Sequence, residues 1–203
     1  MIQRSLLLSA FVLLSSIVGG APKSLAATDG PASFVSDLAS RALAPMPNED
    51  TAVKQERFRQ LFRQYFDVEA CARAALGPYW LKATALQRQE FVGLYEDYVV
   101  IAYSTAFRAL GGESFKVLGS QSDKGRVIVT SRIEINDAAP IRVDWQLNPT
   151  SRGYKVTDVI VNGISMASAQ HSDLVSVIQR NSGHVPALLV AMREKNASNG
   201  ILR

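Results

Sequence analysis

The apolar positions of the chain follow two different periods, and the change falls near residue 115. Before that point apolar residues recur every three to four positions, as they do over residues 58–66, which predicts amphipathic helices. After it they alternate with polar residues, most clearly over 127–135 and 141–147, which predicts strands with one buried face. A helical period returns near the end of the chain. The pattern therefore predicts a helical first half, a stranded middle and a short helical tail.

The first half contains three short or medium helices. One is expected over residues 34–42 and should end before Pro45, and the run at 58–66 marks the second. Asp67 can cap a third, short helix, which Gly77-Pro78 ends because this pair disrupts helical backbone. The basic side chains of the second helix are interpreted as its solvated face; they are Lys54, Arg57, Arg59 and Arg63.

A fourth helix is longer and has an unusual composition. Thr84 and Gln87 stand three residues apart, as in a capping box, and the helix can run to about Leu110. Its C-terminal part, Val99 to Phe107, is apolar or small almost all round, interrupted by Ser104 and Thr105. Because a helix that is apolar all round must be buried on several sides, this part should lie in a core or line an apolar cavity.

The middle of the chain predicts an antiparallel sheet of four strands. The strands are expected at 115–118, 127–135, 141–147 and 154–164, with short turns between them. Two further helices should follow, around 174–178 and 185–192. We therefore expect an α+β fold in which helices pack on one face of a curved four-stranded antiparallel sheet and enclose an apolar pocket.

The N-terminus resembles a secretory signal peptide. Met1 to Arg4 form a basic start, Leu6 to Val18 an apolar run, and Ser24-Leu25-Ala26 a cleavage site of small residues. The apolar run of about 13 residues is shorter than the roughly 20 that cross a bilayer. We expect residues 1–26 to be removed and a soluble, exported protein to begin near Ala27, with a retained membrane anchor as the alternative.

Residues 27–203 are expected to form one domain, mostly helical over 31–110, stranded over 115–166 and helical again over 168–196. The segment contains 20 basic and 18 acidic side chains, without a basic block interleaved with aromatic residues, so nucleic-acid binding is not expected. Cys71 is the only cysteine, so no internal disulfide can form, and it is interpreted as a small buried apolar residue.

The sequence offers little support for catalysis. The two histidines, His171 and His184, lack metal-ligand spacing, and no nucleophile elbow, Walker A or dinucleotide motif occurs, so no cofactor or metal is expected. The best acid–base candidates are Asp144 and Asp158, on neighbouring expected strands, where they could form a carboxylate pair. A structural role, such as an ion pair with Arg142, is the more common use of such residues.

Two sequence blocks resemble the MlaC family, also called the toluene-tolerance family of auxiliary transport proteins. The first is Leu76-Gly77-Pro78-Tyr79-Trp80 followed by residues 83–91, which resembles a Gly-x-Tyr-Trp turn and a Thr-x-x-Gln-Arg-x-x-Phe helix start. The second is 154–159 with 162–165, which resembles the signature WKVxDVxVEGVS. Tyr154 and Asn162 depart from that signature, where Trp and Glu are usual. The two blocks stand in the family's order and, with the secretion signal, span nearly the whole chain.

The resemblance implies a non-enzymatic periplasmic lipid carrier without a cofactor. Members of the family move phospholipid between an outer-membrane lipoprotein complex and an inner-membrane ABC transporter, whose MCE-domain protein is the partner there, and so maintain outer-membrane lipid asymmetry. A sister branch is linked to hopanoid transport, and this alternative stays open. Two rival hypotheses are an enzyme that uses Asp144 or Asp158 as a base on an apolar substrate, and a module without a ligand that docks a membrane protein.

We expect the lipid in a cleft between the inner face of the sheet and the long helix. The candidate lining residues are Val99, Tyr103, Phe107, Val129, Val143, Trp145, Val159, Val161 and Ile164. Tyr79 and Trp80 are expected either to form part of the wall or to fix the helix turn. Ordinary core packing is an equally good interpretation of each, because periodicity identifies a buried face and not what the face contacts.

Overall fold

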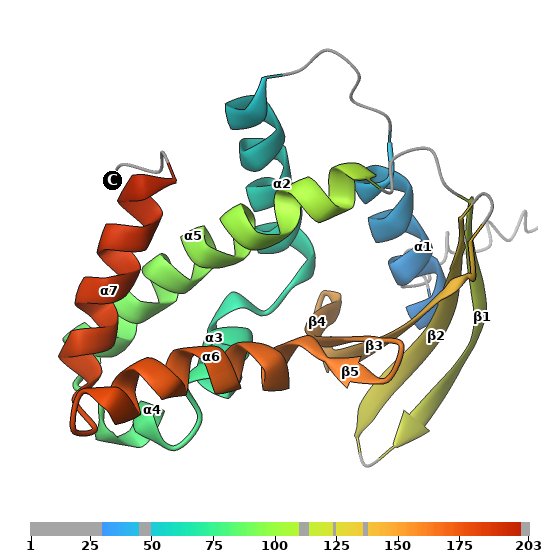
Figure 1. Cartoon of the computed structure of the whole chain (residues 1–203). Helices are drawn as coiled ribbons and strands as arrows, with labels where there is room; N and C mark the ends of the chain where they lie inside the picture. Colours follow the sequence, from blue (N-terminus) through green and yellow to red (C-terminus); the bar gives the residue numbers. More distant parts are fainter. Residues whose placement is uncertain (1–29, 45–49, 110–113, 124, 136–137, 200–203) are drawn as a thin grey trace, which may run out of the picture.

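The helices of the first half follow the expected order in a computed structural model, which describes residues 30–44, 50–109, 114–123, 125–135 and 138–199 (Figure 1). The side chains of 105–109 and 123 are not described within those ranges. The expected signal segment, 1–26, lies outside them and stays a prediction. The five helices before the sheet are α1 (Pro31–Ala42), α2 (Thr51–Tyr65), α3 (Val68–Leu76), α4 (Tyr79–Lys82) and α5 (Ala85–Ala109).

Local sequence signals fix where these helices begin and end. The Asp67 carboxylate accepts a hydrogen bond from the Ala70 amide at 3.0 Å and caps α3. The amide of Thr84 donates to Gln87 Oε1, and the amide of Gln87 donates to Thr84 Oγ1, so the expected capping box precedes α5. Gly77 ends α3 with φ +56, and a Cβ there would lie 2.4 Å from the ring of His171. This position therefore needs glycine for both its backbone and its space.

The sheet has five strands rather than the four expected. The strands pair antiparallel in chain order, as β1 (Ser114–Asp123), β2 (Arg126–Glu134), β3 (Ile141–Thr150), β4 (Gly153–Val161) and β5 (Ile164–Ser165). The expected fourth strand, 154–164, breaks at Asn162 and Gly163, which both have positive φ, and the chain turns back so that β5 pairs with β4. Two residues of this kind form the tight turn of a β-hairpin. The first strand also extends to Asp123, five residues beyond its expected end.

Among the described residues, two apolar clusters make up the core. Helices α3 and α5 pack with α6 (Met166–Arg180) and α7 (Val185–Ser198) around Leu76, Phe91 and Ile178. The second cluster joins α1 to the sheet through Val35 and Val129. Helix α2 contributes to both clusters, since Phe62 belongs to the first and Tyr65 to the second.

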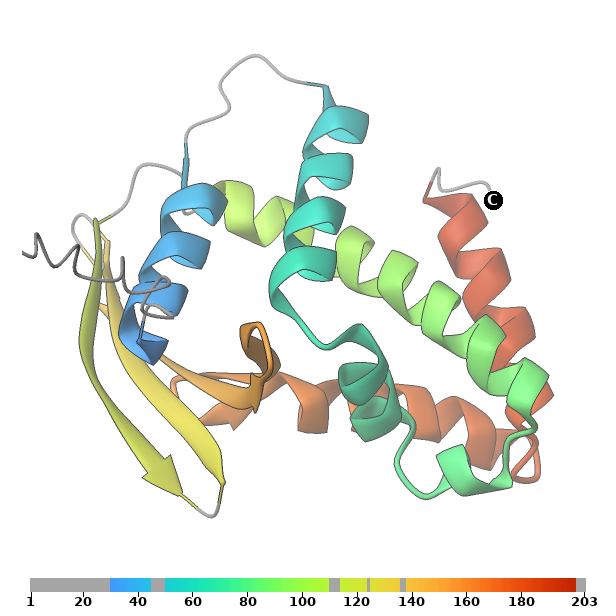
Figure 2. The same ribbon diagram turned by 180° about the vertical axis from the view of Figure 1, so that it is seen from behind.

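The helices lie on one side of the curved sheet, which gives the expected α+β class (Figures 1 and 2). Helix α1 covers part of that face, and the other helices form the larger body beside it. Within the described part of the chain, no helix combines the length and the apolar character that a membrane span requires.

Candidate functional site

A cavity of about 320 Å³ lies where the two apolar clusters meet. Its helical side is formed by residues of α1, α2, α5 and α6, and its other side by the inner face of the sheet. The helical lining includes Ala42, Phe58, Phe62, Phe66, Tyr95, Val99, Tyr103 and Met166. The strand lining includes Phe115, Ile133, Ile141, Val143, Trp145, Val159 and Val161. Nearly all of these side chains are apolar, so the cavity suits a hydrocarbon ligand.

Six of the expected lining residues are brought together on this cavity. They are Val99, Tyr103, Val143, Trp145, Val159 and Val161. Their position satisfies the geometric part of the expectation, whereas their contact with a lipid stays a prediction. The side chain of Phe107, a further expected residue on α5, lies outside the described part.

Four expected residues lie away from the cavity lining. Val129 shares its strand face with Ile133, but it is fully buried in the cluster that α1 forms with the sheet. Ile164 is 62% exposed because the turn before it directs β5 back along the sheet edge. Tyr79 and Trp80 form part of α4 and pack against the helical cluster, where Trp80 lies beneath two arginine side chains. The alternative role considered for them, fixing the helix turn, agrees with this packing.

Helix α2 and its C-cap supply one of the parts of the wall that sequence reasoning missed. Phe58 and Phe62 lie on α2 and Phe66 is its C-cap, each four residues from the next, and the ring centroids of Phe62 and Phe66 are 4.9 Å apart. The spacing identified an apolar helix face, which is the only signal that the sequence provides for them. Nothing in that pattern distinguishes a face that fills a core from one that borders a cavity.

Polar groups in the cavity wall are already hydrogen bonded within the protein. The Asp158 carboxylate accepts from the amides of Val159 and Ala167 and from the hydroxyl of Ser165. Gln170 accepts from the Tyr95 hydroxyl at 2.5 Å and donates to the Tyr103 hydroxyl at 3.1 Å. Burial raises the pKa of Tyr95 above its ordinary value, so this phenol stays neutral. These contacts leave the cavity surface apolar although its wall contains a carboxylate and an amide.

Cys71 also borders the cavity, and its thiol lies 3.5 Å from the carbonyl oxygen of Thr157. Burial raises the pKa of this thiol to about 12, with smaller contributions from Asp67 and Asp158. Because a thiolate is the reactive form, Cys71 is inert near neutral pH. This environment fits the sequence interpretation of Cys71 as a small buried apolar residue.

The candidate carboxylate pair does not form. Asp144 lies opposite Ile160 in the sheet and contacts the hydroxyl of Thr130 at 2.7 Å and the guanidinium of Arg142 at 3.1 Å. Asp158 binds the start of α6 instead, as described above. Both acids therefore have structural partners, and the described residues contain no group of three or more potential metal ligands.

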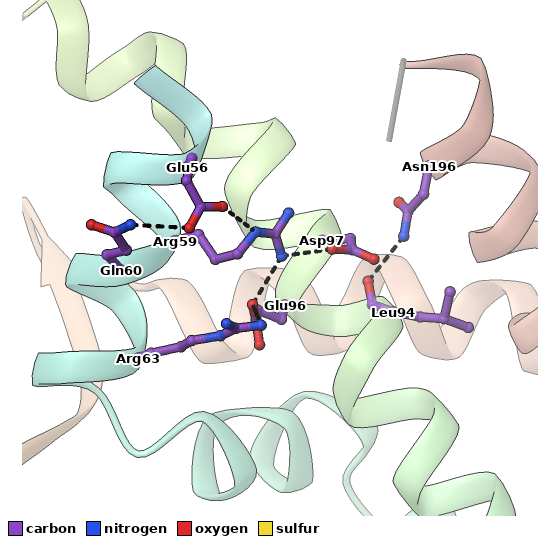
Figure 3. Close-up of polar contacts among 8 residues, drawn as sticks. All are labelled: Glu56, Arg59, Gln60, Arg63, Leu94, Glu96, Asp97 and Asn196. Atoms are coloured by element: carbon purple, nitrogen blue, oxygen red, sulfur yellow. Dashed lines mark hydrogen bonds and ion pairs between the residues drawn. The ribbon is translucent and has the colours of Figure 1, made fainter. Parts of the chain in front are cut away.

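Buried ion pairs attach α2 to α5 (Figure 3). The guanidinium of Arg59 lies 2.8 Å from Glu96 and 2.7 Å from Asp97, and Arg63 contacts Glu96 at 2.9 Å. Glu96 and Asp97 are buried, and the Arg59 side chain is only 13% exposed. The interpretation of Arg59 as a solvated residue was therefore wrong, because its acidic partners are remote in sequence. These contacts hold the phenylalanine-bearing helix against the helix that carries Tyr95 and Val99.

Comparisons with known proteins agree with this architecture. The family model described as MlaC protein matches residues 35–194, which include nearly all of the described fold. Among solved structures, a phospholipid-binding protein from Ralstonia solanacearum, determined in complex with a phospholipid, has a TM-score of 0.68 with this chain. It is 20% identical, and the match covers 83% of this chain and 96% of that protein. The structural match establishes a common fold. Because the family model covers most of the sequence, this chain belongs to the MlaC family.

Proposed function

We propose that this protein is a periplasmic carrier that holds a phospholipid by its acyl chains and moves it between membranes. The observation that supports the proposal is the apolar cavity between α2, α5 and the sheet, whose polar wall groups are all engaged within the protein. The fold shared with a phospholipid-binding protein adds to it.

The physical chemistry of hydrocarbon transfer fits such a cavity. Each methylene withdrawn from water contributes about 0.8 kcal/mol, so a long acyl chain partitions strongly into any apolar space. Transfer from a bilayer is a different exchange, because the chain leaves one apolar environment for another. A cavity whose hydrogen-bonding groups are engaged within the protein can therefore accept and release lipid with nearly balanced free energies.

The size of the cavity limits what it holds in this conformation. Its volume of about 320 Å³ is about twice that of an engineered apolar cavity that binds benzene. This space fits much of one acyl chain. A ligand with two long chains therefore requires the walls to separate or the second chain to extend through the opening.

The cellular part of the proposal follows from the family. In this proposal, residues 1–26 direct export and residues 27–203 form the single carrier domain. The domain exchanges lipid with an outer-membrane lipoprotein complex and with the MCE-domain protein of an inner-membrane ABC transporter, and this exchange maintains outer-membrane lipid asymmetry.

A transfer assay tests the carrier activity. The protein is incubated with donor liposomes that contain fluorescent phospholipid, separated from them and mixed with unlabelled acceptor liposomes. We expect uptake and delivery by the wild type, and a strong loss of both when Ala42→Trp fills the cavity from α1. The matched control is Leu118→Trp, since Leu118 is exposed on β1 and lies outside the cavity lining. A folded wild-type protein that takes up no lipid would refute the proposal.

A further inference from the structure

A second, smaller hollow adjoins the apolar cavity and is lined by residues of α1, α2 and α5. It measures about 30 Å³ and shares Ala42, Phe58, Phe62 and Phe66 with the main cavity. Its remaining walls combine the apolar Leu38 and Leu61 with Lys54, Arg57 and Ser104. A set of cationic and hydroxyl side chains therefore stands one layer of phenylalanine side chains away from the hydrocarbon-like cavity.

The four basic residues of α2 fall into two groups. Arg59 and Arg63 contact the buried acids of α5, as Figure 3 shows. Lys54 and Arg57 make no ion pair with any acid in the described part of the chain, although both are half-buried. The first pair of charges is thus matched by acids of α5, and the second pair is matched by none of the described acids.

No acid among the described residues forms an ion pair with the second group. Asp50, the N-cap residue of α2, precedes Lys54 by four residues and forms no ion pair with it. Asp37 of α1 is bound by Arg41 and by the hydroxyl of Tyr65. The positive charge at the small hollow therefore remains available to an external anion.

The donors at the hollow are also available. One nitrogen of Arg57 donates to the carbonyl oxygen of Arg41 at 3.2 Å, which holds the side chain near the end of α1. Since a guanidinium carries five N–H donors, most of them remain free. The Lys54 ammonium and the Ser104 hydroxyl have no hydrogen-bond partner in the described structure. Ser104 is one of the two polar residues that interrupt the apolar end of α5.

We propose that Lys54, Arg57 and Ser104 form the subsite for the phosphate of the bound lipid. The inference rests on the proposed function, since it assigns the headgroup end of the same ligand. An anionic phosphodiester offers charged acceptor oxygens to a lysine, an arginine and a hydroxyl, and charge-assisted hydrogen bonds of this kind are the stronger ones. Because the cavity itself recognises only hydrocarbon, the subsite is what distinguishes a phospholipid from an uncharged lipid with the same chains.

Binding measurements with two short-chain lipids test the subsite. The probes are a dihexanoyl phosphatidylglycerol and the diacylglycerol with the same chains. Binding of each is measured by the change in tryptophan fluorescence, since Trp145 lies in the cavity wall. The variant Lys54→Gln/Arg57→Gln is compared with Lys116→Gln/Arg126→Gln, which removes two exposed charges from β1 and β2, outside both hollows.

We expect the first variant to bind the phospholipid roughly tenfold more weakly, as two partly exposed charge contacts suggest, and the diacylglycerol unchanged. The control variant should bind both lipids as the wild type does. Equal weakening of both lipids, or no weakening of either, would overturn the phosphate assignment and leave the carrier proposal intact. A wild type that binds neither lipid would instead refute the carrier proposal.

Inorganic phosphate is the third probe, because it presents the same anionic oxygens without acyl chains. We expect phospholipid to displace it from the wild type. Phosphate that binds through Lys54 and Arg57 and is not displaced by phospholipid would assign these residues to a free-anion site and overturn the inference.

Discussion

The ion pairs between α2 and α5 predict a large loss of stability when Arg59 is replaced by methionine. The substitution removes the guanidinium that contacts both Glu96 and Asp97, and Asp97 is only 1% exposed. Removal of one partner from a buried ion pair costs about 3–5 kcal/mol. We expect about 3 kcal/mol, the lower end of that range, because Arg63 still contacts Glu96 and Asp97 has a further interaction.

Urea unfolding of the wild type and of Arg59→Met measures this loss of free energy. In thermal unfolding of the same two proteins the midpoint should fall by about 6–12 °C, since 1 kcal/mol corresponds to about 2–4 °C in a domain of this size. The matched control is Arg193→Met, because Arg193 joins α7 to Glu90 of α5 by a pair that is 58% and 42% exposed. An exposed pair contributes about 0–1 kcal/mol. Equal losses in the two variants would refute the argument that burial makes the Arg59 contacts strong.

Three further predictions concern the cavity wall. Val129→Ala opens a new cavity in the packed sheet cluster and should cost about 2 kcal/mol in urea unfolding. Val143→Ala enlarges a cavity that already exists and should cost about half as much. Equal costs would contradict the reasoning. Cys71 should resist a thiol reagent at pH 8 until the protein unfolds, because burial raises the pKa of its thiol to about 12. Rapid labelling of the native protein would contradict this burial. Tyr95→Phe leaves the Gln170 oxygen without its donor and should cost about 1–3 kcal/mol in the same unfolding assay, which an unchanged midpoint would disprove.

The sequence predicts best those parts of the fold that local interactions determine. The capping box at Thr84 and Gln87 is an example, because both partners lie within one turn of helix. The extra strand is the opposite case. Asn162-Gly163 is a typical hairpin dipeptide, but the apolar residues around it continue the strand pattern, so periodicity alone predicts one strand across the turn.

The candidate site could be predicted only in part, because periodicity identifies a face and not its neighbours. Val129 and Ile133 share one face of β2 and belong to the same cluster with α1, yet Ile133 borders the cavity and Val129 does not. Tyr79 and Trp80 belong to the sequence block that resembles the family, which identifies the fold without placing these residues on the cavity. Arg59 was misread because its acids lie 37 and 38 residues away, on another helix.

Detergent-free purification followed by native mass spectrometry tests whether the protein carries a phospholipid. The protein is exported to a bacterial periplasm, isolated without detergent, weighed intact and then extracted with solvent to identify any lipid. Our account predicts a mass increase that corresponds to one diacyl phospholipid on each protein molecule and is absent from the Ala42→Trp variant. A hopanoid in the extract would replace the phospholipid in the proposal. A protein that is empty, and stays empty after incubation with labelled liposomes, would contradict the account.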